Sequence, residues 1–246
     1  MKKNNNTKII FYFIIYFLLF FVLIYSGIKI YEWYRDKNKN NEIAKKIKET
    51  VIVESNGKNK EEYLIDFDKL KEQNNEAIAW IKVNNTNIEY PVVKTKNNEF
   101  YLNHSFDKSE NLGGWIFADY KNKFNGTDKN IVIYGHNMKD NSMFGTMQNI
   151  LNPEWYNNEE NTNIILKTEG KNYIYKVFSI YRIENEDYYI KTEFSNDSEF
   201  EQFLNTLKAR SIRDFNMDML ESDSILTLST CDNNNKYRVV LHAKKI

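Results

Sequence analysis

The hydrophobic pattern opens with an uncharged apolar run from Ile9 to Ile28. Its twenty residues match the ~20 that a helix needs to cross a ~30 Å hydrocarbon core. No polar face interrupts the run, which argues against the buried core helix of a soluble domain. A cleaved signal peptide usually has a shorter apolar part, of roughly 7–15 residues, and a small-residue cleavage site that this sequence lacks. We therefore predict a transmembrane signal anchor over residues 9–28.

The charges that flank this anchor give only a weak bias on its orientation. Lysines precede the apolar run, whereas the basic residues after it are mixed with Glu32 and Asp36. A single N-terminal anchor most often leaves the following domain outside the cell. We therefore expect a cytoplasmic N-terminus over residues 1–8 and an extracellular domain.

A polar stretch rich in Lys, Asn and Glu follows the anchor, over residues 29–60. Within it, Ile43, Ala44 and Ile47 form a faint stripe at helical spacing. We interpret this stretch as a partly helical stalk or linker. A single folded domain is then expected over residues 61–246.

The pattern at the start of the domain predicts two short helical segments. The first passes through Phe67 and Leu70, and a polar break at Asn74 and Asn75 ends it. The second is a short turn that reaches Trp80.

After residue 86 the apolar positions alternate with the period of two that a half-buried strand requires. The predicted strands are residues 86–93, 114–117, 131–134, 163–166, 173–183, 224–229 and 237–243. Many short strands at this spacing are typical of a barrel or a sandwich. The fold class is therefore mainly β.

One clear helix interrupts the strands, at about residues 198–210. Ser198 and Glu201 fit a capping box at its start. The apolar residues that follow have the i, i+3, i+4, i+7 spacing of a buried helix face. They are Phe200, Phe203, Leu204 and Leu207.

Composition and charge narrow the function classes. The 34 Lys and Arg residues balance 34 Asp and Glu residues, so we expect no nucleic-acid partner. One Cys and three His leave too few soft ligands for a zinc site. We therefore expect neither a metal nor another cofactor.

The single cysteine, Cys231, is the first candidate for chemistry, because an unpaired thiol outside the cytosol is a liability unless it is buried or used. Strand alternation places it on the face opposite Leu226 and Leu228, which we expect to point into the core. If a hairpin closes around residues 232–237, Arg238 stands opposite Cys231, with Cβ atoms roughly 5 Å apart. Spacing alone leaves a reactive and an inert cysteine equally open.

A reactive thiol also needs a base, since a free thiol of pKa ~8.5 is only a few per cent thiolate near neutrality. His136 follows an apolar strand and a glycine that permits a sharp turn, a setting in which functional side chains are often presented. His104 and His242 lack that setting and fit surface or core histidines. The sequence contains no G-x-S-x-G, H-E-x-x-H, Walker A or G-x-G-x-x-G motif.

These residues resemble a known family. The motifs TLSTC and YGHNM, with an arginine on the last strand, are those of sortases, and residues 80–243 are similar to class B sortases. Further matching segments are WIKVNNTNIEYPVV, FYLNHSFD, GGWIFADYKN, IVIYGHNMKDNSMFG and FEQFLNTLKARS. The resemblance implies a closed eight-stranded β-barrel with N-terminal helices, an extra helix before the last two strands and a preceding transmembrane helix.

The resemblance also implies roles for the three candidate residues. Cys231 is then the nucleophile, His136 the acid and base, and Arg238 the group that steadies the substrate carbonyl and its oxyanion. The implied enzyme is a cysteine transpeptidase of the thiol-peptidase class. It cleaves a C-terminal sorting signal of secreted proteins, forms a thioacyl intermediate and passes the protein to an amine of peptidoglycan or its lipid-linked precursor. The implied location is the cell membrane of a Gram-positive bacterium, with a single span.

Further residues are expected in the substrate groove. Ser229 lies two residues before Cys231 on the same strand face, and Thr230 lies between them. Asn98 and Leu102 match groove positions of class B relatives. Tyr188 and Tyr189 precede the extra helix and are expected to form the far wall.

Two other functions stay open from the sequence. A cysteine protease or amidase of the same fold shares the thiolate, the histidine and the oxyanion donor, and differs only in using water as acceptor. A membrane-tethered binding module would leave Cys231 structural, and the joint presence of His136 and Arg238 argues against it.

Overall fold

The computed structural model describes residues 5–54, 63–184, 186–231 and 236–246. Within it the chain forms two compact units, residues 1–39 and 40–246. Helix α1 (Asn5–Val51) begins in the first unit and ends in the second.

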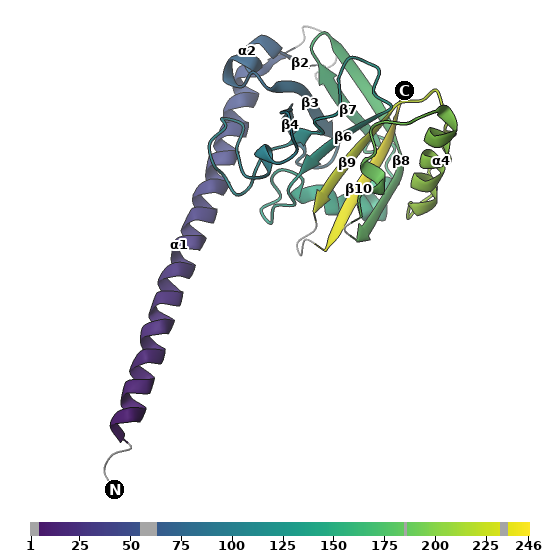
Figure 1. Cartoon of the computed structure of the whole chain (residues 1–246). Coiled ribbons are helices and arrows are strands. Elements are labelled where there is room, and N and C mark those ends of the chain that lie inside the picture. Colours follow the sequence, from purple (N-terminus) through teal and green to yellow (C-terminus); the bar gives the residue numbers. More distant parts are fainter. Residues whose placement is uncertain (1–4, 55–62, 185, 232–235) are drawn as a thin grey trace. The chain divides into compact units, whose positions relative to one another are not determined.

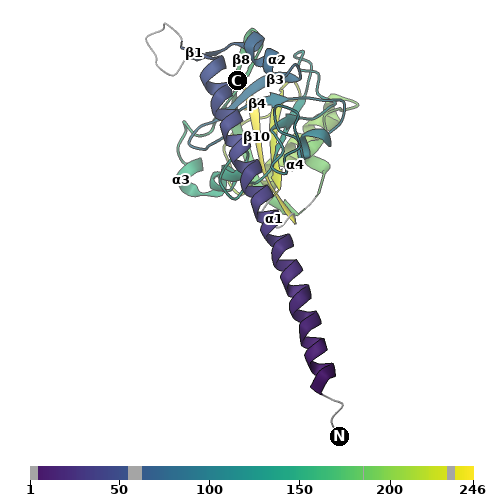
Figure 2. The ribbon, with the colours of Figure 1, turned by 90° about the vertical axis from the view of Figure 1, so that its left-hand side faces the viewer.

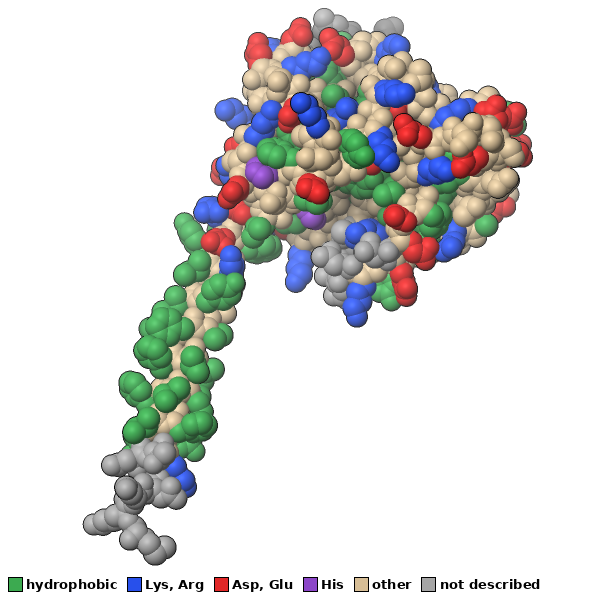
Figure 3. Space-filling view, viewed as in Figure 1, with side chains coloured by type: hydrophobic (Ala, Val, Ile, Leu, Met, Phe, Trp, Pro, Cys, Tyr) green, Lys and Arg blue, Asp and Glu red, His purple; other side chains and the backbone are tan. Residues whose placement is uncertain are grey.

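The first unit consists of the N-terminal part of α1. Within the described residues, one helix is long and apolar enough to cross a membrane, and it is this one. Its hydrophobic side chains are exposed and cover the visible face of the segment (Figure 3). The signal sequence of an exported protein has the same length and composition, so the helix suits either a span or a signal.

The second unit is built on a barrel. In the part of the chain that the structure describes, eight strands close in the order β10-β8-β7-β3-β4-β5-β6-β9 (Figure 1). Two neighbouring pairs are parallel, β4 with β5 and β6 with β9, and the other pairs are antiparallel. The strands are β3 (Ala77–Val83), β4 (Glu89–Val93), β5 (Phe117–Ala118), β6 (Asn130–Gly135), β7 (Asn163–Thr168), β8 (Lys171–Glu184), β9 (Ile225–Cys231) and β10 (Tyr237–Lys245).

Short elements connect and flank these strands. The helices and 3₁₀ turns are α2 (Phe67–Gln73), η1 (Phe100–Leu102), η2 (Gly145–Leu151), α3 (Pro153–Tyr156), η3 (Tyr188–Ile190) and α4 (Asp197–Arg210). A separate two-stranded ribbon pairs β1 (Ile52–Glu54) with β2 (Tyr63–Ile65). The closed mainly-β barrel, the N-terminal helix and the helix before the last two strands agree with the expected fold class.

The prediction of a short helical turn that reaches Trp80 is wrong, because Ala77–Val83 is strand β3. This strand pairs with β4 on one side and β7 on the other. Its side chains are buried in both alternating sets, with Ala79, Trp80 and Ile81 all fully buried. A strand buried on both faces reads as a continuous apolar run without a period of two, so its sequence pattern does not separate it from a helical turn.

Helix α4 confirms the predicted apolar stripe but begins two residues earlier than the capping box suggested. Asn196 is the N-cap, and its Oδ1 accepts a hydrogen bond from the Glu199 N–H at 2.9 Å. The Glu199 carboxylate accepts from the N–H of Ser195, the residue before the N-cap, at 2.6 Å, so the helix start is capped by Asn196 and not by the predicted box on Ser198. The four predicted apolar residues, Phe200, Phe203, Leu204 and Leu207, are buried against β8, β9 and β10.

The last turns of α1 belong to the barrel unit. Ile47 and Val51 are fully buried in the main core, and Ile43 and Ala44 pack against it. Figure 2 views the barrel from the side that carries these turns. Residues 40–51, which the sequence assigns to a linker, therefore form a packed amphipathic helix, because the faint stripe of the pattern is a buried face. Residues 55–60 of the expected linker lie outside the described residues.

A buried polar layer lies between the barrel wall and α4. The Asn130 amide NH₂ donates to the Lys191 carbonyl at 2.9 Å, so its Oδ1 is the acceptor that receives the Thr227 hydroxyl at 2.7 Å. Thr227 then accepts from His242 Nδ1 at 2.9 Å, and His242 Nε2 accepts from the Tyr181 hydroxyl at 2.8 Å. The Lys191 carbonyl fixes the proton positions as far as His242 Nδ1, and burial, which lowers the pKa of His242, leaves Nε2 without a proton. His242 is therefore neutral and fully satisfied.

We expect a chain that starts at residue 30 to be soluble and to keep the thermal transition of the barrel, since the compact unit begins at Asn40. A chain that starts at residue 61 should be less stable. It lacks Ile47 and Val51, and burial of a large aliphatic side chain contributes about 1.5–3 kcal/mol. Urea unfolding of both chains measures the difference. Equal midpoints, or aggregation of the longer chain, would contradict this assignment.

His242 should make stability fall in acid. Burial lowers its pKa from 6.5 to about 3, so the folded protein keeps the neutral ring while the unfolded chain takes up a proton below about pH 6.5. Stability from this residue is present above pH 6.5 and is lost between pH 6.5 and 3, by about 1.4 kcal/mol per pH unit for one proton. Unfolding of wild type and His242→Gln across this range isolates the contribution as a difference in slope. Parallel curves would show that the ring does not titrate in this way.

Candidate active site

The site lies where the C-terminal ends of β6 and β9 meet the start of β10. Antiparallel pairing of β9 with β10 places Arg238 opposite Cys231, which confirms the hairpin register expected from the sequence. Parallel pairing of β6 with β9 places Gly135 opposite Thr230, so His136 follows next to the end of β9. The backbone of Cys231 is described as the last residue of β9, whereas its side chain and residues 232–235 lie outside the described part of the chain.

The two faces of β9 have different environments. Leu226 and Leu228 are fully buried in the main core, as expected. Ile225 and Thr227 point the other way, into the layer beneath α4. Ser229 continues that second face, beyond the end of the layer, and lines a cavity.

This cavity has a volume of about 260 Å³ and gathers the sequence-predicted residues from five parts of the chain. Apart from Cys231, the expected catalytic and groove residues all line it, with the exception of Tyr188. The lining residues are Asn98, Leu102, Phe117, Tyr134, Gly135, His136, Glu186, Asp187, Tyr189, Ile190, Ser229, Thr230 and Arg238.

His136 is held at the cavity by close packing around Gly135 and by one hydrogen bond. A Cβ on Gly135 would lie 2.5 Å from Ile116 Cδ1 and 2.7 Å from the Phe144 ring, so this position needs glycine. The His136 ring is half-buried, and its Nε2 is 2.8 Å from the carbonyl oxygen of Leu102. A carbonyl only accepts, so Nε2 carries a proton and Nδ1 is the nitrogen with the lone pair in the neutral ring.

The other two histidines are placed elsewhere. His104 stacks on the Phe100 ring with centroids 4.0 Å apart, and its Nδ1 lies 2.8 Å from the Phe100 carbonyl oxygen. His242 is buried in the layer beneath α4. Among the three histidines of the chain, all of them described, His136 is the one that lines the cavity. Arg238 supplies a half-buried guanidinium from β10 to the same cavity.

Ser229 and Tyr189 join two walls of the cavity. Their hydroxyl oxygens are 2.8 Å apart, and both residues are almost fully buried. Tyr189 comes from η3, between β8 and α4, so this contact fixes the turn against the end of β9. Tyr188 does not line the cavity. Its hydroxyl donates to Tyr181 at 3.2 Å, in the buried polar layer.

Asn98 is bound to a buried carboxylate on the opposite wall. Its NH₂ donates to Asp119 Oδ2 at 2.8 Å, and its Oδ1 accepts from the Tyr120 N–H at 3.0 Å. The Tyr134 hydroxyl donates to the same Asp119 oxygen at 2.9 Å. Burial, with the nearby Asp119 charge, raises the pKa of Tyr134 far above its usual range. Tyr134 is thus a neutral donor in the wall.

Sequence reasoning missed several lining residues. Tyr134 lies two residues before His136 on the same strand face, and that period of two was the available signal. Glu186, Asp187 and Ile190 come from the turn before α4, and no motif marks them. Among the described residues, no group of three or more His, Cys, Asp or Glu is arranged to hold a metal ion.

The chemistry available at this cavity is that of a positioned imidazole and a guanidinium beside the strand end that carries the only cysteine. An imidazole moves protons near neutral pH, and a guanidinium stabilises negative charge on oxygen. The expected catalytic set is therefore brought together by three neighbouring strands.

Comparison with known proteins agrees with this architecture. The Sortase domain family matches residues 81–246. The chain is 34% identical over 233 residues to sortase B of Listeria monocytogenes, and the match covers 92% of each chain. The structure of Clostridium perfringens sortase B is similar with a TM-score of 0.69 at 39% identity, covering 74% of this chain and all of that one. A Staphylococcus aureus sortase B–substrate complex is similar with a TM-score of 0.68 at 34% identity, covering 73% of this chain and 84% of that one.

The closed barrel, the order of the motifs along the strands and these matches over most of the chain lead to one conclusion: the protein belongs to the sortase family of cysteine transpeptidases, in class B.

Proposed function

We propose that this protein is a membrane-anchored transpeptidase that cleaves a C-terminal sorting signal of secreted proteins and joins them to an amine of the cell wall. The observation that carries the proposal is the meeting of β6, β9 and β10 at one cavity. That meeting places His136 and Arg238 beside the strand end that holds Cys231. The same three residue types serve covalent acyl transfer wherever a thiolate, an acid and an oxyanion donor are combined.

In the proposed first step, the Cys231 thiolate attacks the carbonyl carbon of the scissile peptide bond. The carbonyl oxygen becomes an oxyanion, which the Arg238 guanidinium stabilises. His136, as imidazolium, gives its proton to the departing amide nitrogen, and the C–N bond breaks. The C-terminal fragment leaves, and the remaining chain is held as a thioester on Cys231.

In the second step, an amine replaces the fragment that left. Neutral His136 takes a proton as the amine nitrogen attacks the thioester carbonyl, and Arg238 again stabilises the oxyanion. Collapse of this intermediate forms the new amide bond and releases the Cys231 thiolate, with His136 protonated as at the start. We propose an amine of peptidoglycan or its lipid-linked precursor as the acceptor.

The cavity supports a peptide as the first substrate. Leu102, Phe117 and Ile190 offer apolar surface, and Ser229, Thr230 and Asn98 offer polar groups along the same walls. The solved structure of a relative, sortase B of Staphylococcus aureus, is a substrate complex. We assign Asn98, Leu102, Tyr189, Ser229 and Thr230 to contacts with the sorting signal.

The location proposed for the enzyme follows from its N-terminal helix. Residues 9–28 are apolar and exposed, which suits a single membrane span. The relatives include sortase B proteins of Listeria monocytogenes and Staphylococcus aureus, both Gram-positive bacteria. We propose that residues 1–8 face the cytoplasm and that the catalytic domain is extracellular, where the cell wall lies.

Product analysis with a sorting-signal peptide tests the proposal. With an added amine, wild type should yield the amide adduct, and Cys231→Ala should yield no product. His136→Ala should lower the rate by ~10²–10⁴, the range for general acid–base catalysis, whereas His104→Ala should retain it. If only the hydrolysed peptide forms at every amine concentration, the protein is a peptidase of the same fold. Turnover by Cys231→Ala would rule out the covalent route.

Arg238→Lys should be nearly as damaging as Arg238→Ala, although it keeps the charge. The proposed role needs a planar fork of N–H donors aimed at the carbonyl oxygen, and an ammonium group does not reproduce that geometry. Loss of one oxyanion donor typically costs ~10²–10³ in kcat, with a much smaller change in KM. Steady-state kinetics of the two variants provide the measurement. A wild-type kcat in Arg238→Lys would show that charge alone is required and would refute the oxyanion role.

A further inference from the structure

The hydrogen bond that orients His136 depends on a loop with an unusual packing arrangement. Its acceptor is the carbonyl of Leu102, in η1. Gly114 packs against that carbonyl, since a Cβ there would lie 2.8 Å from the Leu102 oxygen, 2.4 Å from the Tyr101 oxygen and 3.0 Å from His136 Cδ2. Gly114 also has φ of +55°, which favours glycine. The peptide of Gly114 is thus the support against which both the Leu102 carbonyl and the His136 ring rest.

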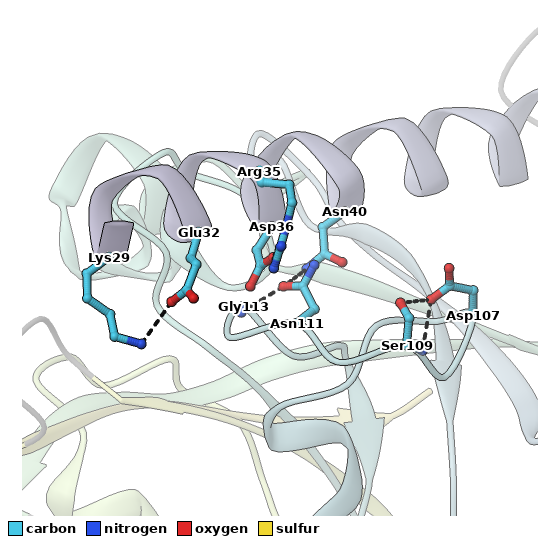
Figure 4. Close-up of polar contacts among 9 residues, drawn as sticks. All are labelled: Lys29, Glu32, Arg35, Asp36, Asn40, Asp107, Ser109, Asn111 and Gly113. Carbon is cyan, nitrogen blue, oxygen red and sulfur yellow. Dashed lines mark hydrogen bonds and ion pairs between the residues drawn. The ribbon is translucent and has the colours of Figure 1, made fainter. Parts of the chain in front are cut away.

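A residue of helix α1 holds this support in place. Asn40 is almost fully buried, and its NH₂ donates to the Gly114 carbonyl at 3.0 Å and to Asn111 Oδ1 at 3.2 Å. Its own Oδ1 accepts from the Ser105 hydroxyl at 2.5 Å. Because Gly114 O only accepts, the orientation of the Asn40 amide is fixed. Figure 4 shows Asn40 projecting from the helix toward Asn111 and the Gly113 backbone.

The partners of Asn40 join the two sides of the loop between η1 and β5. The Asn111 N–H donates to the Asn103 carbonyl at 2.9 Å, directly after η1. Asn111 Oδ1 also accepts from the Gly113 N–H at 2.9 Å, directly before Gly114. Ser105 and Asn111 are both buried. Asn40 therefore lies at the centre of a polar cluster that water does not reach, where a lost partner leaves buried groups unpaired.

We propose that Asn40 is a positioning residue for the active site. By binding the Gly114 carbonyl, it keeps the Leu102 carbonyl in position to accept the hydrogen bond from His136 Nε2. The lone pair of the neutral ring then stays on Nδ1. The inference rests on the proposed role of His136. It also assigns a function to the C-terminal part of α1, which the sequence pattern did not indicate. Asn40, in this part of the helix, supports the loop that orients His136.

Substitutions at Asn40 in the full-length chain test the proposal. Asn40→Ala removes the donor and acceptor, and Asn40→Asp keeps the size of the side chain but removes the NH₂ that bonds Gly114. Both should lower kcat for peptide cleavage by about 10- to 100-fold, as expected when a reacting group is displaced, with KM changed by less than about twofold. Asn41→Ala is the matched control, since the neighbouring asparagine is exposed on the same helix, and it should behave as wild type.

A second control separates positioning from stability. Ile47→Ala truncates a fully buried residue of the same helix segment and should lower the thermal midpoint without changing kcat at temperatures where the variant is folded. Ser105→Ala keeps the Asn40–Gly114 bond and should have an effect smaller than that of Asn40→Ala. A folded Asn40→Asp variant with the kcat of wild type would overturn the proposal.

The NMR chemical shifts of the His136 ring nitrogens give a readout that does not need turnover. They are measured on ¹⁵N-labelled full-length protein in detergent, and the His136→Gln variant assigns the signals. Wild type should show the Nε2–H tautomer, and Asn40→Ala and Asn40→Asp should show a mixture of tautomers, whereas Asn41→Ala and Ile47→Ala should match wild type. If wild type cleaves no sorting peptide, the proposed function fails and the tautomer measurement still decides the role of Asn40. An unchanged tautomer in folded Asn40 variants would refute it.

Discussion

The parallel pairing of β6 with β9 is the constraint on which the rest of this structure depends. It is the long-range contact that places the two central strands of the site together, because residues 130–135 and 225–230 are far apart in the sequence. The register puts Gly135 beside Thr230, and the following residue, His136, reaches the end of β9. Antiparallel pairing with β10 then adds Arg238 from the other side. A shift of one residue in either register would turn a candidate catalytic side chain to the opposite face.

Both faces of β9 and β10 are covered along most of their length. The inner face packs into the barrel core through Leu226 and Leu228. The outer face is covered by α4 and contains a polar chain that includes Thr227 and His242. Each polar group in that chain of hydrogen bonds has a partner. Its burial therefore carries no free-energy penalty from an unsatisfied donor or acceptor. The cavity opens only where this covering ends, at Ser229.

The residues around the cavity form two supports for the candidate catalytic residues. On one side, the Ser229–Tyr189 contact ties the turn before α4 to β9. On the other, the loop between η1 and β5 supplies the Leu102 carbonyl to His136, and Asn40 of α1 holds that loop from behind. Both supports use buried hydrogen bonds, which are strong in the low dielectric of the interior and costly to break. Elements that lie far from the strand ends in the sequence thereby hold those ends in place.

Sequence alone determined the parts of this protein that depend on local pattern. The apolar run of residues 9–28, the alternating strands, the buried face of α4 and the opposition of Cys231 and Arg238 across a short hairpin all follow from periodicity and spacing. The family resemblance added the closed barrel and the roles proposed for His136, Cys231 and Arg238. Its groove positions, Asn98 and Leu102, line the cavity in the structure.

Tertiary structure decided what depends on neighbours from elsewhere in the chain. Ala77–Val83 is a strand because two partners pair with it and bury both faces, which removes the alternation that would mark it. Residues 40–51 pack on the barrel because Ile47 and Val51 meet a core that only the folded strands create. Asn40 had no visible role in the pattern, since a lone asparagine in a polar stretch becomes informative only when its buried partners are known. Local pattern determines the elements that have one buried and one exposed face, whereas burial and pairing between distant segments determine the elements buried on both faces and which side chains meet.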